Sequence, residues 1–291
     1  MILIIDSHAH YAYERYDSEV AYLFEQDGKF DVCLADRETL LSEMKKNGIV
    51  GFIEPSVGFD AIGKQLQFVS DHSSFIWAAV GVHPTRCIHT DWDKREKVRE
   101  YAENNNIIAI GETGLDYHTE EAVQNSDFQK QWFIYHIELA DRLQLPLVLH
   151  IRMADADALE ILKANQSKLH GGTVHCFSED YQIAQEYINL GFTLGIGGKL
   201  LWENNIGNIL RDTVSRVPLE SLLVETDAPY VLPPFDKELH KIYPDKKISN
   251  SSLILPALVK KIAELKGETD ETVENTIYQN TVRTFALPIM K

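Results

Sequence analysis

The sequence predicts an α/β fold, a (β/α)8 barrel of the TIM type. Eight short apolar runs rich in β-branched residues recur along the chain, and longer amphipathic stretches separate them. The runs are continuously apolar rather than alternating, which is the pattern of parallel strands buried on both faces. Eight such strands close into a barrel. The alternative is an open doubly wound sheet, but no GxGxxG motif follows a strand here.

The predicted elements follow from these patterns. The strands are expected at residues 2–5, 49–53, 75–82, 107–110, 145–149, 173–174, 192–196 and 222–224. Helical spacing of apolar residues is seen at 38–46, 128–143 and 181–190. Two segments fall outside this rhythm. Residues 11–35 form an aromatic-rich segment and residues 231–250 a loop with prolines and lysines, and both would lie at the carboxyl end of the barrel.

Length and composition indicate one domain in a reducing compartment. The 291 residues are 44% hydrophobic, which suits a single barrel domain over 1–291. Acidic residues outnumber basic ones by 44 to 28, so the net charge of -16 gives no general attraction to nucleic acid or anionic membranes. The cysteines, Cys33, Cys87 and Cys176, suggest neither a disulfide framework nor a thiolate zinc site. No apolar stretch is long enough for a signal or a membrane span, so we expect a cytoplasmic protein.

Polar residues that can bind metal follow six of the predicted strands. A barrel brings the carboxyl ends of its strands to one face, so residues distant in sequence are expected to meet there. His8 and His10 are two residues apart on an extended strand and can chelate one ion. Imidazoles mixed with carboxylates favour Zn, Mn or Co over an all-oxygen calcium cage. The predicted ligands of one or two divalent ions are His8, His10, Glu112, His150, His175 and Asp227.

Other residues near these strand ends have two readings each. His83 is expected to face substrate or to support a ligand rather than to bind metal. Arg152 either binds a substrate phosphate or forms a structural ion pair. Cys176 is expected to be a small buried hydrophobe. The lysines of the 231–250 loop either bind phosphate or form a solvated face.

Seven sequence blocks resemble the TatD-related metal-dependent hydrolases, a branch of the amidohydrolase-like barrels. The blocks are DSHAH at 6–10, GVHP at 81–84, GETGLDY at 111–117, LPLVLHIR at 145–152, HCFS at 175–178, ETDAPY at 225–230 and NTVRTFAL at 280–287. The resemblance covers nearly the whole chain. It departs at Ile248–Ser252, where the family commonly has Arg-Asn-Glu-Pro, and at Glu179, where Gly is usual.

The resemblance implies a site for two metal ions, Zn, Mn or Mg. His8, His10 and Asp227 would hold one ion, His150 and His175 the other, and Glu112 would bridge them. Members of the family hydrolyse phosphodiesters, including DNA from its 3′ end. The implied substrate is a DNA strand end or a small phosphoester, and the sequence indicates no obligate protein partner.

The chemistry expected from these residues is hydrolysis by metal-activated water. Asp227 is assigned as proton acceptor and Glu112 as a second catalytic residue, while Arg152 and His83 are assigned to substrate binding. Two rivals remain. The same barrel and metals can hydrolyse amide, lactone or cyclic C–N bonds, because an activated water does not choose the substrate. A metal-binding barrel without catalysis is the second.

The aromatic segment after His10 supports a further hypothesis. Its rings could stack on bases near the metals, or they could pack the segment onto the barrel. The rings are Tyr11, Tyr13, Tyr16, Tyr22, Phe24 and Phe30. Their exposure separates the two possibilities.

Overall fold

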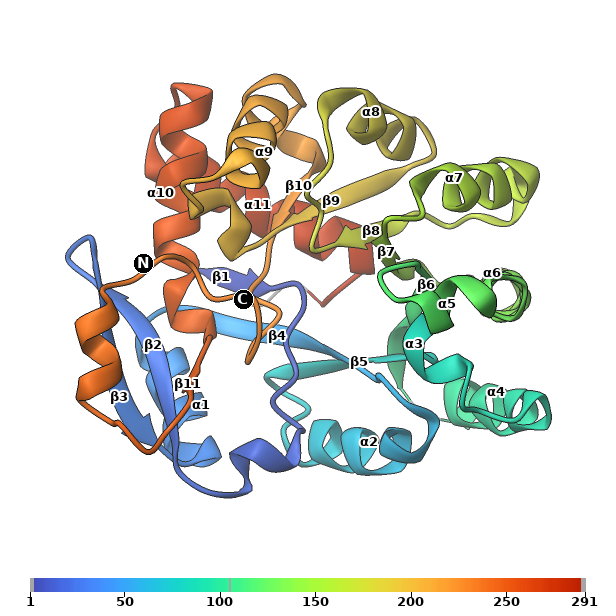
Figure 1. Cartoon of the computed structure of the whole chain (residues 1–291), viewed down its shortest axis with the longest axis horizontal. Coiled ribbons are helices and arrows are strands. Elements are labelled where there is room, and N and C mark those ends of the chain that lie inside the picture. The colour runs from blue at the N-terminus through green and yellow to red at the C-terminus, as the bar shows by residue number, and fades with distance from the viewer. Residues whose placement is uncertain (1–2, 105, 289–291) are drawn as a thin grey trace. The chain divides into compact units, whose positions relative to one another are not determined.

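The computed structural model describes residues 3–104 and 106–288, and its main sheet has eight strands in chain order (Figure 1). The strands are β1 (Ile4–Asp6), β4 (Ile49–Pro55), β5 (Ile76–Val80), β6 (Ile107–Asp116), β7 (Leu147–Arg152), β8 (Gly172–His175), β9 (Phe192–Ile196) and β10 (Leu222–Val224). Their pairing is parallel, and helices connect them. This is the predicted (β/α)8 topology; residue 2 of the first predicted strand lies outside the described residues.

The three amphipathic stretches at 38–46, 128–143 and 181–190 correspond to the helices α1, α6 and α8, and further helices lie between the other strands. They are α1 (Arg37–Lys46), α2 (Ile62–Asp71), α3 (Pro84–Cys87), α4 (Arg95–Asn104), α5 (Glu120–Gln124), α6 (Ser126–Leu143), α7 (Asp155–Ala164), α8 (Tyr181–Asn189), α9 (Asn205–Arg216), α10 (Leu255–Lys266) and α11 (Asp270–Phe285). Short 3-10 helices are η1 (Glu14–Asp17), η2 (Phe59–Ala61), η3 (Trp92–Lys94), η4 (Gln166–Lys168), η5 (Gly198–Leu201), η6 (Leu219–Ser221), η7 (Lys237–Lys241) and η8 (Ser252–Ile254). Local signals set the ends: Asp36 caps α1 by accepting from Thr39 N, and α10 stops at the left-handed Gly267.

The chain forms two compact units. The first contains the residues up to Ile53 together with Cys176–Tyr181 and Gly195–Thr281. The second contains Glu54–His175, Gln182–Leu194 and the residues from Val282 onward. Each unit is built from several separate stretches of sequence. A single domain over 1–291 stays a prediction.

In the first unit, the first and last strands of the main sheet are neighbours. β1 pairs with β4 on one side. On the other side, Ser7 N donates to Val224 O at 3.0 Å, so β10 lies next to β1. β10 in turn follows β9, since Glu225 N donates to Ile196 O at 3.1 Å. Pairing of the last strand with the first is what a closed barrel requires.

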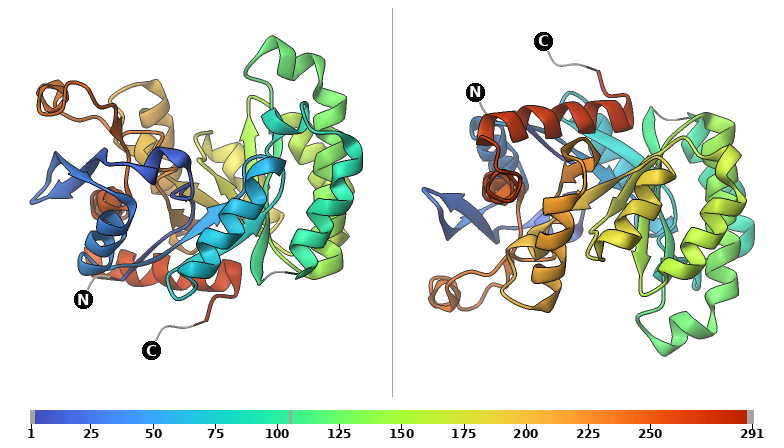
Figure 2. Two further views of the ribbon diagram at one scale, coloured as in Figure 1. Left: turned by 90° about the horizontal axis from the view of Figure 1, so that it is seen from below. Right: turned by 90° about the horizontal axis from the view of Figure 1, so that it is seen from above.

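The same unit carries a small second sheet where the sequence predicted loops. β2 (Val20–Gln26) and β3 (Lys29–Ala35) form an antiparallel hairpin, and β11 (Ile248–Ser249) adds to β2. The loop expected over 11–35 is therefore wrong. The hairpin turns at Asp27 and Gly28, which have φ values of 53° and 81°. Asp-Gly is a favoured pair for such turns because both positions need positive φ. Figure 1 shows β11, in orange, next to this blue hairpin, and Figure 2 shows the hairpin projecting from two further sides.

In the second unit, β6 is longer than predicted and continues to Asp116. Its extension pairs with β7, so that Gly114 lies opposite His150 and Asp116 opposite Arg152. Gly114 has a φ of 134°, and a Cβ there would lie 2.2 Å from His150 O. Only glycine allows this close approach of the two strands. The glycine thus keeps β6 paired with β7 past Glu112, where the apolar pattern ends.

Buried side chains form the core of each unit. In the second unit, Trp132 and Phe133 of α6 are fully buried, and His136 on the same helix is also buried. His136 accepts a hydrogen bond from Val82 N at 3.2 Å and lies 2.9 Å from Thr113 Oγ1. It is a satisfied core histidine. Among the described residues, no helix is long and apolar enough to cross a membrane.

Candidate metal centre

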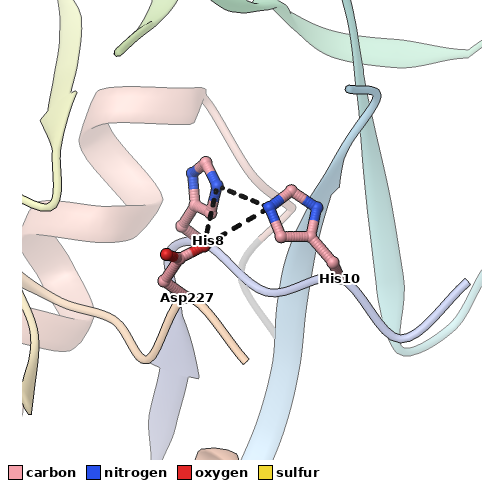
Figure 3. Close-up of side chains that lie close together, drawn as sticks. All are labelled: His8, His10 and Asp227. Carbon is pink, nitrogen blue, oxygen red and sulfur yellow. Dashed lines mark hydrogen bonds and ion pairs between the residues drawn. The ribbon is translucent and has the colours of Figure 1, made fainter. Parts of the chain in front are cut away.

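The first unit brings together three of the predicted ligands, which we call the His8 group: His8, His10 and Asp227. The histidines lie in the segment after β1, and Asp227 lies in the segment after β10 (Figure 3). The Nε2 atoms of His8 and His10 are 3.1 Å apart. Asp227 Oδ1 lies 3.4 Å from His10 Nε2 and 3.9 Å from His8 Nε2. The rings and the carboxylate point toward one another.

These separations fit a bound metal ion. Ligand atoms about 2.0–2.2 Å from a four-coordinate ion are themselves about 3.3–3.5 Å apart. The three observed separations of 3.1, 3.4 and 3.9 Å bracket that range. Both histidines are buried, while the Asp227 side chain is 16% exposed. The donor set can therefore hold one ion with its carboxylate side open to solvent.

The backbone around Asp227 is held in an unusual conformation. Its φ of 54° is in the left-handed region, which is costly for a residue with a Cβ. Two hydrogen bonds fix it there, from Asp227 N to His8 O at 2.9 Å and from Tyr230 N to Asp227 O at 2.7 Å. Such strain clusters at functional sites, where it aims a side chain. Here it aims Asp227 at the two imidazoles.

A buried carboxylate that sequence analysis did not single out supports the His8 group. Asp6 is fully buried at the end of β1 and accepts from His8 N and from both the backbone and hydroxyl of Thr226. Its fourth donor is the Ser252 hydroxyl, at 2.7 Å. Burial raises the pKa of Asp6 to about 7, against the lowering effect of these hydrogen bonds. Asp6 thus connects the segment after β1, which carries His8, to the segment after β10, which carries Asp227.

The second unit brings together the other predicted ligands, which with His83 we call the Glu112 group. Glu112 lies within β6, His150 within β7, and His175 ends β8. Glu112 Oε1 lies 2.9 Å from His150 Nδ1, 3.5 Å from His175 Nε2 and 3.6 Å from His83 Nε2. One carboxylate oxygen is therefore surrounded by three imidazoles.

Asp116 adds a residue to this group that sequence analysis missed. Its Oδ2 lies 3.0 Å from His150 Nε2, while His150 Nδ1 faces Glu112. Burial would lower the pKa of His150, but its hydrogen bonds to Asp116 and Glu112 outweigh this and raise the pKa to about 9. A carboxylate on the far nitrogen of a ligating histidine commonly fixes the ring and its tautomer. The signal was present in the GETGLDY block, whose aspartate follows the predicted strand by six positions.

The hydrogen bonds of His83 indicate which of its ring nitrogens carries the proton. Its Nδ1 accepts from Thr85 N at 3.1 Å, which caps α3. Burial, with the nearby charge of His150, lowers the pKa of His83 to about 3, so the ring is neutral. A neutral ring that accepts at Nδ1 carries its proton on Nε2. In this tautomer Nε2 of His83 directs its proton toward Glu112 Oε1, 3.6 Å away, while His83, Glu112 and His150 also lie close enough together to share an ion.

Two cations lie near the ligand groups. Arg152 is exposed at the end of β7, opposite Asp116, and its positive charge helps to lower the pKa of that carboxyl; across residues 3–104 and 106–288 it lies within 4 Å of no carboxylate oxygen. In the first unit, Lys199 Nζ donates to Cys176 O at 3.2 Å and to Ser178 Oγ at 3.3 Å. No carboxylate of the described chain pairs with Lys199. Sequence analysis missed Lys199 because it follows β9, the one late strand without a metal-binding motif.

Two further expectations are changed by the structure. Cys176 is half-buried with a φ of 54°, so the expectation of a buried hydrophobe is wrong. In the 231–250 segment, Lys241 pairs with Glu238 at 2.6 Å and Lys246 donates to Glu19 O at 2.7 Å. These contacts support the reading of a solvated face for these two lysines.

A (β/α)8 barrel with imidazoles and carboxylates at its strand ends defines the class of metal-dependent hydrolases. A family model described as TatD related DNase matches residues 5–286, and the chain belongs to this family. The chain is 28% identical over 285 residues to the uncharacterized metal-dependent hydrolase YabD of Bacillus subtilis, covering 98% of this chain and all of the relative. It is 32% identical over 252 residues to the 3'-5' ssDNA/RNA exonuclease TatD of a Rahnella species, covering 87% and 93%.

Solved structures confirm the predicted fold. The TatD homologue YjjV of Escherichia coli K12 superposes with a TM-score of 0.81 at 24% identity, covering 98% of each chain. A TatD-family hydrolase from Entamoeba histolytica gives a TM-score of 0.79 at 20% identity, also covering 98% of each chain. The family resemblance and the barrel are thus confirmed. The individual ligands stay predictions.

Proposed function

We propose that this hydrolase cleaves phosphodiester bonds of DNA, as a 3′–5′ exonuclease that uses two divalent ions. The His8 group would hold one ion and the Glu112 group the other. The observation that carries the proposal is that His8, His10 and Asp227 have metal-like spacing, while Glu112 Oε1 lies within 3.5 Å of a ring nitrogen of both His150 and His175. The exonuclease name of the Rahnella relative supports the choice of substrate.

Divalent ions held by such ligands lower the pKa of bound water and stabilise charge on phosphoryl oxygens. The chain's own residues would do the rest. Asp227 Oδ1 faces His10, and the side chain is partly open to solvent, so the carboxylate can accept the proton of an attacking water. The His83 Nε2 proton is available to a substrate oxygen near Glu112.

Two cations are candidates for contacts with the phosphates of the substrate. Arg152 is exposed at the strand end, and its planar fork matches phosphate geometry. Lys199 is held only by neutral oxygens, so its charge is available to an anion. Within an acidic chain, a few local cations favour capture of a strand end over tracking along a duplex.

Free thiols at Cys33, Cys87 and Cys176 support our proposal of a cytoplasmic location.

The test is a metal-dependent activity panel on the purified chain. We expect two ions per chain by elemental analysis and release of nucleotides from the 3′ end of single-stranded DNA with Mn or Mg. Asp227→Asn should lower turnover by orders of magnitude while leaving the melting temperature nearly unchanged, because it keeps shape but removes a ligand and proton acceptor. Asp245→Asn, at an exposed aspartate of the same unit, is the matched control.

Three results would overturn the proposal. Hydrolysis of amides or lactones with no phosphodiester activity would assign the chain to amidohydrolase chemistry. An Asp227→Asn variant that cleaves DNA at the parent rate would show that the metal assignment is wrong. Absence of turnover on the whole panel, with metal bound, would favour a binding protein.

A further inference from the structure

An aromatic cluster adjoins the His8 group. The ring of Tyr13 stacks on the ring of His10, with centroids 5.2 Å apart and planes inclined by 14°. Tyr230 meets Tyr13 edge to face, with centroids 6.2 Å apart at 73°. Tyr230 ends the ETDAPY block and lies outside the aromatic segment at 11–35. The cluster therefore starts at a proposed metal ligand and ends at Tyr230.

Exposure separates these rings from the packing rings of the same segment. Tyr11 and Tyr16 are 0% and 1% exposed, and Tyr11 Oη lies 3.0 Å from Ser252 Oγ. The hypothesis that Tyr11 stacks on a base is wrong, since no face of it is open. Tyr13 is half-buried, whereas Tyr230 is 47% exposed. Packing explains the first two rings but leaves the open surface of Tyr230 unexplained.

The position of Tyr230 is fixed relative to the metal ligand. Its backbone N donates to Asp227 O at 2.7 Å, closing a tight turn between the two residues. Asn250 Nδ2 donates to Val231 O and to Thr226 O, and these two hydrogen bonds fix the backbone on either side of the turn. An exposed aromatic ring on a rigid turn presents surface at little cost in conformational entropy. It is suited to bind a flat apolar group next to the ion.

We propose that Tyr230, supported by Tyr13, is a stacking subsite for the nucleobase next to the bond that is cut. The inference rests on the proposed function and narrows its substrate to single strands, whose bases are free to leave the helix. Aromatic stacking tolerates every base and does not depend on positive charge. That suits a chain whose net charge is -16, since long-range attraction to phosphates is weak.

The experiment compares two oligonucleotides that are identical except at the reacting 3′ nucleotide. This nucleotide carries its base in one strand and is abasic in the other. Tyr230→Ala should raise KM for the intact strand by about 5- to 100-fold, the range expected for one lost stacking contact. Tyr230→Phe should restore the parent KM because it keeps the ring face. For the abasic strand, parent and Tyr230→Ala should have equal KM. Tyr243→Ala, in the neighbouring segment, is the matched control.

A binding measurement separates failure of the subsite from failure of the proposed function. Fluorescence anisotropy with both strands, on Asp227→Asn and on Asp227→Asn with Tyr230→Ala, needs no turnover. A higher Kd in the double variant than in Asp227→Asn, seen for the intact strand alone, supports the subsite. Equal losses for intact and abasic strands, or no loss for either, would overturn it. A parent chain that cuts no phosphodiester while the base-dependent Kd persists would refute the exonuclease but keep the stacking surface.

Discussion

The hydroxyl of Ser252 donates a hydrogen bond of 2.7 Å to the buried carboxylate of Asp6, 246 positions away in sequence. Tyr11 Oη, 3.0 Å from the same hydroxyl, accepts from Ser252 N at 2.8 Å. The segment where this chain departs from the usual Arg-Asn-Glu-Pro block therefore has a structural role. It supplies a polar contact that supports the end of β1.

Replacing Ser252 by alanine should destabilise the chain by about 1–3 kcal/mol, because a buried carboxylate loses one of its donors. Urea unfolding of the metal-free protein measures this. Ser215→Ala is the matched control, since its hydroxyl contacts only Asp212 O on the exposed face of α9. Equal unfolding midpoints for the two variants would show that the Ser252 contact contributes nothing.

Asp116→Asn should weaken binding of the ion at the Glu112 group by about 10- to 100-fold, the usual effect of removing the carboxylate behind a ligating histidine. Competition with a chromogenic chelator gives the affinity. Asp127→Asn, at an exposed residue of α6, should bind metal like the parent. Unchanged affinity in Asp116→Asn would mean that His150 does not need its partner.

His136 should make stability fall as the pH falls from about 6.5 to about 4. Burial lowers its pKa to about 4, so between these values the unfolded chain takes up a proton that the folded chain does not. This contribution is present above pH 6.5 and is lost at about 1.4 kcal/mol per pH unit on the way down. His136→Gln, which can still accept from Val82 N, should show a shallower decline in urea unfolding. Parallel curves for parent and variant would contradict the assignment.

Arg152→Met and Lys199→Met should each raise KM for a DNA strand by about tenfold, the cost of one charge-assisted contact to phosphate. Turnover at saturation should change less. Lys241→Met removes a lysine that pairs with Glu238 and should leave KM at the parent value. If all three variants behave alike, the loss reflects net charge and not a specific contact.

The sequence predicted the barrel because strands and helices depend on local pattern, whereas metal binding by the predicted ligands stays a prediction. Apolar runs mark strands, and the polar residue that ends each run marks the functional face. Predicted and observed bounds agree closely for β9 and β10. The end of β6 could not be predicted from hydrophobicity, since its last residues are held by the close approach at Gly114 and by polar pairs such as Asp116 with His150.

Contacts made over long sequence separations were also beyond prediction. The Asp27–Gly28 pair in the sequence indicates a hairpin turn, but no sequence pattern indicates the pairing of β11 with β2. Nothing in the sequence distinguishes Tyr11, buried against Ser252, from Tyr13, which stacks on His10. Their roles depend on which neighbours fold over them.

The pairing of the last strand with the first determines when the His8 group is assembled during synthesis. His8 emerges from the ribosome 219 positions before Asp227. At about 5–20 residues per second, the two histidines wait roughly 10–40 s for their carboxylate. The hydrogen bonds from Ser7 N to Val224 O and from Asp227 N to His8 O can form only then. A nascent or prematurely terminated chain that lacks β10 therefore carries His8 and His10 without Asp227, so the proposed ion site of the His8 group would be complete only after most of the chain has been translated.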